Sequence, residues 1–162
     1  MAEASAWLLT LDAELRAAVG AREMIHLIQS PTLFSIPDTP DYCRQVLLWQ
    51  EEIVPVIDLA AWLRGSRAVL APALVGIFAY QTADGIAYGA LPLAAVPARR
   101  RVSDEQACVL PTQPPGWARI ALSCFNDGDK KVPILDLRHL FSGALLHDNR
   151  PLAETRQEKI RQ

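Results

Sequence analysis

Val54-Pro55-Val56-Ile57-Asp58-Leu59 occurs a second time in this chain, as Val132-Pro133-Ile134-Leu135-Asp136-Leu137. The two copies start at positions 54 and 132, which are 78 residues apart, and the same offset separates Gly65 from Gly143. Stacked solenoid repeats need three or more copies to bury a continuous core, whereas a period near half the chain length suits a pair of units. The repeat therefore predicts two similar lobes.

Each copy begins as a short strand. Residues 54–57 and 132–135 are apolar and partly β-branched, which is typical of a buried strand. Pro55 and Pro133 have no N–H to donate, so each proline belongs at a sheet edge, at a strand start or at a bulge. We therefore expect both strands to be short.

Each copy continues as a short helix. Asp58 and Asp136 stand where a carboxylate can accept the free N–H groups of a helical first turn, and the following residues, 59–64 and 137–142, fit about one and a half turns. A glycine after each helix suits a left-handed cap. The alternative is that the two aspartates form an acid/base pair, but capping explains both of them. We interpret six residues as the structural motif: Pro55, Asp58, Gly65, Pro133, Asp136 and Gly143.

The rest of the chain consists of short apolar runs between turn signals, which is typical of small barrels. Two segments, 15–19 and 21–29, fit a strand or a helix equally well. Three hairpins are predicted. The first joins residues 43–49 to 53–57 through Gln50-Glu51-Glu52, and the second joins 74–80 to 86–91 through Thr82-Ala83-Asp84-Gly85. The third joins 117–125 to 131–135 through Asn126-Asp127-Gly128-Asp129.

Composition narrows the function. The 162 residues are 51% hydrophobic, which is ample for a packed core, and the net charge of −2 argues against a broad nucleic-acid-binding face. The one dense basic run, residues 99–101, is expected to be an exposed, solvated segment. No run approaches the ~20 apolar residues of a membrane span, so we expect a cytoplasmic protein without direct membrane insertion.

The sequence gives little support for catalysis. Cys43, Cys108 and Cys124 are widely spaced and odd in number, which fits reduced thiols better than a disulfide frame or a zinc site. The usual short motifs of nucleotide enzymes, hydrolases and metalloproteases are absent. We therefore predict no enzyme, no catalytic residue, no metal and no cofactor. The alternative is a small cysteine-dependent enzyme that uses Cys124, His139 and Asp136, and it requires these groups to converge.

The order of proline connector, strand, polar turn and repeated phrase resembles the CheW-like domain, an adaptor module of bacterial chemosensory systems. The residues that carry the resemblance are Ile36-Pro37, Pro40, Tyr42, Val46-Leu47, residues 53–59, Gly76, Asp84-Gly85 and residues 132–140. The resemblance implies a mainly β fold of two small five-stranded SH3-like barrels packed around a shared hydrophobic interface, with short helices. It places one domain over 1–162, with half-modules at approximately 1–66 and 67–148 and a polar tail at 149–162.

The same resemblance implies a non-enzymatic adaptor that couples a methyl-accepting chemoreceptor to a CheA-type histidine kinase. The family's Arg-Gly pair in the first hairpin turn is replaced here by Gln50 and Glu51, and glutamine lacks the charged fork of arginine. The departure favours a specialised pathway, such as one controlling type IV pili or twitching motility. It also leaves open a divergent competitor that binds without coupling. Candidate partner contacts are Leu48, Trp49, Gln50 and Glu51, and Trp49 has the alternative of a core residue beneath the hairpin.

Overall fold

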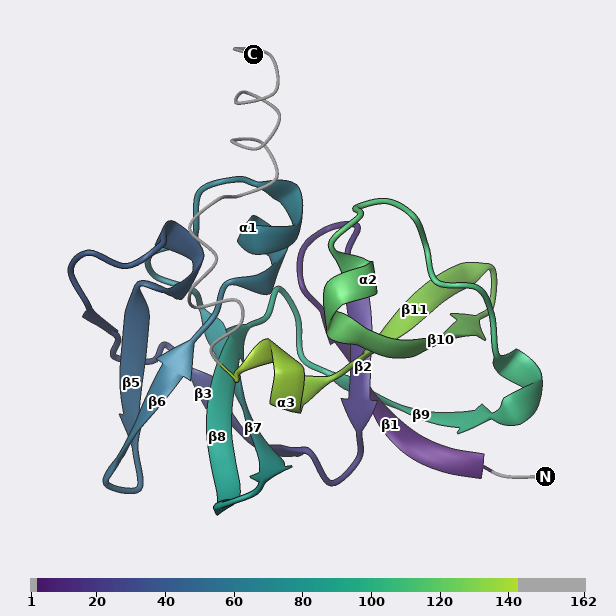
Figure 1. Ribbon diagram of the computed structural model, residues 1–162, viewed down its shortest axis with the longest axis horizontal. Helices are drawn as coiled ribbons and strands as arrows, with labels where there is room; N and C mark the ends of the chain where they lie inside the picture. Colours follow the sequence, from purple (N-terminus) through teal and green to yellow (C-terminus); the bar gives the residue numbers. More distant parts are fainter. Residues whose placement is uncertain (1–2, 143–162) are drawn as a thin grey trace, which may run out of the picture.

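The computed structural model describes residues 3–142, which form two curled β-sheets lying side by side (Figure 1). We call the six-stranded sheet, on the left in Figure 1, the central lobe. Its strand order is β3-β7-β8-β6-β5-β4. The bounds are β3 (Met24–Gln29), β4 (Phe34–Ser35), β5 (Gln45–Trp49), β6 (Glu52–Val56), β7 (Leu74–Thr82) and β8 (Gly85–Pro92).

The five-stranded sheet, on the right in Figure 1, is the terminal lobe, because it uses strands from both ends of the described chain. Its strand order is β10-β11-β2-β1-β9. The bounds are β1 (Glu3–Thr10), β2 (Arg16–Gly20), β9 (Ala98–Ser103), β10 (Ala121–Asp127) and β11 (Lys130–Leu135). The helices are short: α1 (Leu59–Arg64), α2 (Trp117–Ile120) and α3 (Leu137–Leu140), with 3₁₀ turns η1 (Asp41–Cys43) and η2 (Asp104–Gln106). The predicted mainly β fold with two lobes is confirmed.

The two copies of the repeated phrase occupy equivalent places. In the central lobe, β6 pairs with β5 antiparallel and with β8 parallel, through Val56 and Ala90. In the terminal lobe, β11 pairs with β10 antiparallel and with β2 parallel, through Ile134 and Ala18. Val56 and Ile134 hold the same position in the two copies of the phrase. The repeat in sequence is therefore a repeat in sheet topology.

The sheets do not follow the approximate division of the sequence at residue 66. β7 and β8 come after that point but complete the central lobe, while β1 and β2 come before it and join β9–β11. The physical reason is the parallel pairing of each repeated strand, since a parallel neighbour has to come from a distant part of the chain. The division 1–66 and 67–148 thus describes the two copies of the module, and it stays a prediction. Gly143 and the predicted tail, 149–162, lie outside the described residues.

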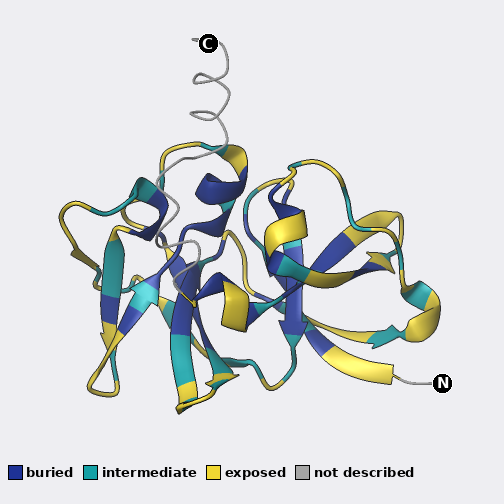
Figure 2. Ribbon diagram, viewed as in Figure 1, coloured by how far each residue is buried: buried dark blue, intermediate teal, exposed yellow. Residues whose placement is uncertain are grey.

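A shared hydrophobic core joins the lobes. Leu9 and Val19 of the terminal lobe pack in one cluster with Leu59, Phe78 and Leu91 of the central lobe. Each sheet also has a smaller cluster of its own. Figure 2 shows the largest concentration of buried residues where the two sheets meet. This arrangement agrees with the shared apolar interface expected for the fold.

Local structure decides two open alternatives and corrects two expected elements. Segments 15–19 and 21–29 resolve as the strands β2 and β3. Residues 117–120 form α2 rather than the start of a strand, because Pro114-Pro115-Gly116 starts a helical turn that buries Trp117 and Ile120 on one face. α3 ends at Leu140, two residues earlier than expected.

Candidate partner-binding surface and interlobe groove

The turn of the β5–β6 hairpin contains two residues rather than three. Trp49 pairs directly with Glu52, so Gln50 and Glu51 alone form the loop, and both are exposed. Their φ angles are 48° and 67°, and two left-handed residues in a two-residue loop are characteristic of a type I′ turn. The expected turn, Gln50-Glu51-Glu52, is therefore one residue too long, and Glu52 belongs to β6.

The pairing places an apolar ladder on the outer face of the hairpin. Leu48 lies opposite Ile53, and their exposed fractions are 61% and 71%. Phe34 of β4 pairs with Val46 on the same face and is 49% exposed. Directly opposed residues in an antiparallel pair have Cβ atoms about 4.5–5.5 Å apart, so these side chains form a contiguous surface. We call Phe34, Val46, Leu48 and Ile53 the apolar ladder.

Trp49 lies on the opposite face of the same hairpin. It is half-buried and packs against the central lobe's own cluster of Leu47, Val54 and other apolar residues. Its ring centroid is 5.3 Å from that of Tyr88 in an edge-to-face arrangement and 6.1 Å from that of His26. The structure thus separates the four candidate contacts: Leu48 is on the ladder, Gln50 and Glu51 are at the turn, and Trp49 supports the sheet from behind.

Sequence reasoning missed Ile53 and Phe34. The expected three-residue turn pairs Ile53 with Trp49 instead of Leu48, and a shift of one residue moves every side chain to the other face. β4 has only two residues, Phe34 and Ser35, so its pairing with β5 leaves almost no periodic signal. No signal in the sequence marks the loop as two residues long, because Gln50 and Glu51 are not typical turn residues, so Ile53 could not be identified.

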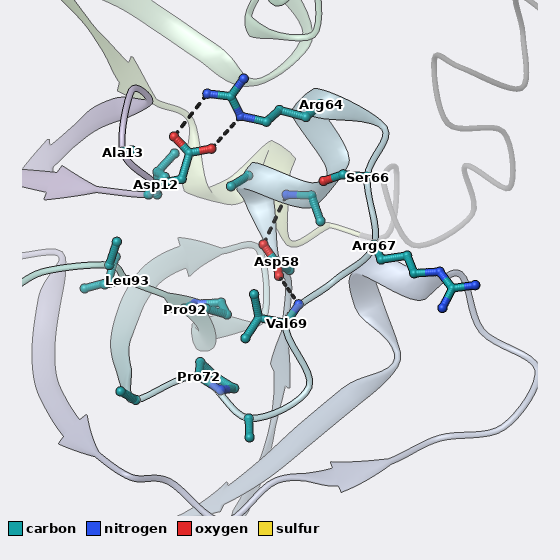
Figure 3. Close-up of a pocket in the computed structure, with 16 residues that line it drawn as sticks. Asp12, Ala13, Asp58, Arg64, Ser66, Arg67, Val69, Pro72, Pro92 and Leu93 are labelled. Atoms are coloured by element: carbon teal, nitrogen blue, oxygen red, sulfur yellow. Dashed lines mark hydrogen bonds and ion pairs between the residues drawn. The ribbon is translucent and has the colours of Figure 1, made fainter.

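A groove of about 460 Å³ lies between the lobes (Figure 3). One side is the β1–β2 loop with Asp12, and the other is the end of α1 with Arg64. Apolar side chains form much of the remaining lining, including Val69, Pro72 and Leu93. The groove thus combines an apolar lining with a charged rim.

An ion pair crosses the rim of this groove. The Arg64 guanidinium donates from Nε to Asp12 Oδ2 and from Nη2 to Asp12 Oδ1, the latter at 3.1 Å. Asp12 Oδ1 also accepts the backbone N–H groups of Glu14 and Leu15 at 2.9 and 2.8 Å. The Arg64 hydrogen bond is the main cause that lowers the pKa of Asp12, and the two backbone donors add to it against partial burial. The pair fixes α1 to the β1–β2 loop.

The repeated aspartates accept hydrogen bonds from backbone groups. Asp58 Oδ1 accepts the Ala61 N–H at 3.1 Å and Asp58 Oδ2 accepts the Val69 N–H at 2.8 Å, as the dashed lines in Figure 3 show. Asp136 Oδ1 accepts the His139 N–H, at 3.2 Å. Both carboxylates cap a helix, and Asp58 in addition holds the loop after α1. Because each carboxylate oxygen of the buried Asp58 already accepts a backbone N–H, this residue is poorly suited to acid/base chemistry.

The other residues of the motif lie in the same modules. Gly65 ends α1 with a φ of 64°, a left-handed conformation that glycine adopts without steric cost. Pro55 lies in β6 opposite Val46, and Pro133 lies in β11 opposite Cys124. Both prolines therefore lie inside strands that have a neighbour on each side, and the expected position at a sheet edge or strand start is wrong.

The groups of the alternative enzyme hypothesis do not meet. Cys124 Sγ lies 2.8 Å from Cys108 Sγ and 3.9 Å from the Phe125 carbonyl oxygen. His139 is an exposed residue of α3, and within residues 3–142 no hydrogen bond joins Cys124 to an imidazole. Over the same residues, no three His, Cys, Asp or Glu side chains are placed to hold a metal ion. None of the helices described over 3–142 is long and apolar enough to cross a membrane.

Comparison with known proteins gives two findings and one negative result. The family model described as CheW-like domain matches residues 6–145. Among solved structures, the scaffolding protein TtCheW from Thermoanaerobacter tengcongensis is similar, with a TM-score of 0.68 and 15% sequence identity over 94% of each chain. At this identity the likeness concerns the fold. A search of curated proteins returned no match.

Proposed function

The chain belongs to the CheW-like domain family, and from this membership we propose that it is a non-enzymatic adaptor that couples a methyl-accepting chemoreceptor to a CheA-type histidine kinase. The observation that carries the proposal is the apolar ladder. Leu48 and Ile53 lie opposite each other on one hairpin, more than half exposed, next to a sheet whose inner face is already packed. Clustered exposed apolar side chains mark protein–protein interfaces in soluble domains.

An adaptor needs two docking faces, and we propose the ladder for the kinase and the interlobe groove for the receptor. The hairpin turn and α1, which borders the groove, lie at opposite ends of the central lobe in Figure 1. Two partners can thus approach without competing for the same residues. The groove's apolar lining suits an apolar segment of a partner, and the Asp12–Arg64 pair on its rim is already neutralised.

We place the protein in the cytoplasm and in a specialised pathway, such as one that controls type IV pili or twitching motility. The support for a specialised pathway is the turn, where Gln50 and Glu51 replace the family's Arg-Gly and so present an amide and a carboxylate to a partner. A partner surface that accepts a carboxylate is neutral or basic, because like charges across an interface repel. Leu48, Gln50 and Glu51 are the proposed contacts, and Trp49 holds the hairpin from behind.

Titration calorimetry with the kinase tests the ladder. We expect Leu48→Ser to weaken binding at least about tenfold, as truncation of an interface anchor typically does. Leu122→Ser is the matched control, because Leu122 is an equally exposed leucine, at 68%, on β10 of the other lobe. Both variants should unfold at the wild-type denaturant concentration. Equal effects of the two changes, or none, would exclude the ladder from the interface.

A phosphorylation assay separates coupling from competition. We expect kinase autophosphorylation to respond to the receptor only when the adaptor is present. A chain that binds the kinase with full affinity but leaves autophosphorylation unresponsive to the receptor is instead the divergent competitor. In that case the ladder remains a docking surface and the coupling role is withdrawn.

A further inference from the structure

Two distant cysteines meet at the edge of the terminal lobe. β10 is the edge strand of its sheet, and the segment that follows η2 lies against its open side. Ala107 forms an isolated antiparallel bridge with Phe125. The Cys108 N–H donates to the Cys124 carbonyl at 3.0 Å, and Gln106 Nε2 donates to the Asn126 carbonyl at 3.0 Å. Residues 106–108 therefore cover the carbonyl groups that β10 presents at the sheet edge.

The register of this bridge puts Cys108 directly opposite Cys124. Directly opposed residues in antiparallel strands have Cα atoms about 4.5–5.5 Å apart, within the 4.4–6.8 Å range found for disulfide-linked cysteines. The sulfur atoms themselves are 2.8 Å apart, although both thiols are free. The backbone is thus already arranged for a bond between them.

We propose that Cys108 and Cys124 are a dithiol modification site, which a peroxide converts into an intramolecular disulfide that fastens residues 106–108 to the β10 edge. The site lies in the lobe opposite the apolar ladder, and it is independent of the adaptor function.

The two thiols have different exposures and so different roles. Cys108 is half-buried and can meet peroxide from solvent, whereas Cys124 is 3% exposed. Burial, and after it the neighbouring Cys108 thiol, raises the pKa of Cys124 to about 12. Cys108 is therefore the thiol that peroxide reaches and oxidises first, and the Cys124 sulfur resolves the product.

The chemistry balances with one peroxide for each chain. The Cys108 sulfur attacks one peroxide oxygen, so an S–O bond forms, the O–O bond breaks, and hydroxide leaves and takes up the thiol proton as water. The Cys124 sulfur then attacks the Cys108 sulfenic acid, so the S–S bond forms and the S–O bond breaks. The second hydroxide leaves with the Cys124 proton as another water. Two thiols are oxidised, and the peroxide is reduced to two waters.

The consequence is a covalent link, which we call the latch, between residues 106–108 and the edge strand β10. In the reduced protein a few hydrogen bonds hold residues 106–108 in place, so we expect this segment to open at times and expose the strand edge. A disulfide between residues 108 and 124 keeps the segment closed. The oxidised protein should thus lose the opening motions of this edge without a change of fold.

Peptide mapping of the full chain tests the proposal. Trypsin places the three cysteines on separate peptides, 23–44, 102–119 and 120–130, because cleavage follows Arg22, Arg44, Arg101, Arg119 and Lys130. After treatment with hydrogen peroxide and alkylation under denaturing conditions, we expect peptides 102–119 and 120–130 to be linked. Cys43 should be fully alkylated, since it is only 6% exposed and therefore shielded from peroxide in the folded protein. Dithiothreitol should restore all three thiols.

Hydrogen exchange and matched variants complete the test. The Cys108 amide should exchange at least about tenfold more slowly in the oxidised protein, while Cys43→Ser should give the same linked peptides and Cys108→Ser none. Terminal oxidation of Cys108 without a cross-link, a disulfide between chains, or three unreacted thiols would each refute the dithiol site. A cross-link that leaves the exchange of this amide unchanged would refute the latch. The wild-type map needs no variant, so a misfolded variant cannot obscure the answer.

Discussion

Gln50 and Glu51 hold backbone conformations that L-residues seldom adopt, with φ angles of 48° and 67°. The left-handed region costs a non-glycine residue about 1 kcal/mol or more, because Cβ crowds the backbone. Type I′ turns usually avoid this cost with Asn-Gly or Gly-Gly. The turn thus carries two side chains although glycine would fit its backbone better. This conformational cost is a further reason to place Gln50 and Glu51 among the contacts.

Glu51→Gly should stabilise the protein by about 1 kcal/mol, because glycine adopts the same conformation without strain. Glu52→Gly is the matched control: residue 52 is in β6, so its replacement should destabilise the protein by roughly 0.5–1 kcal/mol. Urea unfolding of the two variants measures both effects. A loss of stability in Glu51→Gly would contradict the strained turn.

The double change Gln50→Arg/Glu51→Gly tests the turn as a specificity element. We expect weaker binding to the native kinase and stronger binding to a flagellar one. The reason is that the double change replaces a negative charge at the turn with a positive one, so a surface that attracted the turn now repels it and the reverse. Calorimetry of both proteins against both kinases gives four affinities. If none of them changes, the turn is outside the interface.

The two capping aspartates should differ in their contribution to stability. Asp58→Ala removes acceptors from two backbone N–H groups and should cost about 2 kcal/mol or more, whereas Asp136→Ala removes one cap contact and should cost about 0.5–1 kcal/mol. Binding of the kinase, which we place on the apolar ladder, should survive in the folded fraction of both variants. Chemical denaturation and a pull-down on the same samples check this, and lost binding at unchanged stability would show that a carboxylate is a contact.

At the scale of elements, the Asp12–Arg64 pair connects the β1–β2 loop to α1. The folded pKa of Asp12 is lowered, mainly by Arg64, so its stabilisation is complete above the unfolded pKa of about 3.9 and is lost as the pH falls through the folded value. Both side chains are partly exposed, at 29% and 39%, so solvent screening limits the contribution to below about 1 kcal/mol.

Asp12→Asn should therefore be slightly less stable than wild type at pH 7, and the difference should disappear as the pH falls through the lowered folded pKa of Asp12. Asparagine keeps an oxygen for the two backbone donors of the loop, so the change isolates the contact with Arg64. The urea midpoint as a function of pH measures the effect. Arg64→Gln should cause the same loss, and the double variant no more, while additive losses would show that the two residues act separately.

Elements with local signals could be predicted from the sequence. The strand, capping aspartate and short helix of the repeated phrase each depend on neighbouring residues, so both modules were predictable. The register of the β5–β6 hairpin could not be predicted, because Gln50 and Glu51 are not the residues that usually form a two-residue turn. The contact between Cys108 and Cys124 depends on a bridge outside the named strands, for which no periodic pattern exists.

At the scale of the whole molecule, α3 of the terminal lobe packs on β7 of the central lobe, and Phe141, the residue after α3, lies over Gly89 of β8. The rings of Phe141 and Tyr80 stack with centroids 5.6 Å apart. Gly89 lies beneath the Phe141 ring, where an added Cβ would approach ring carbons to 2.5 Å. The absence of a side chain at residue 89 is what allows the close approach of the lobes.

Gly89→Ala should destabilise the protein by about 1–3 kcal/mol, because the aromatic ring has to move out of a packed position. Calorimetric unfolding measures the loss. Phe141→Leu in the same chain should recover part of it, since leucine removes the ring carbons that clash. Strictly additive losses in the double variant would contradict a direct contact between residue 89 and the ring.

The strands of the terminal lobe come from the two ends of the described chain, so they are synthesised at different times during translation. β1 and β2 are made first, but their sheet partners β9 and β11 follow only after the whole central lobe has been synthesised. At elongation rates of about 5–20 residues per second, that interval is on the order of 10 s. An isolated hairpin is marginally stable in water, so the nascent β1–β2 segment spends this time with both edges unpaired. The central lobe, contiguous in sequence, can meanwhile fold and offer the surface on which the late strands close the sheet.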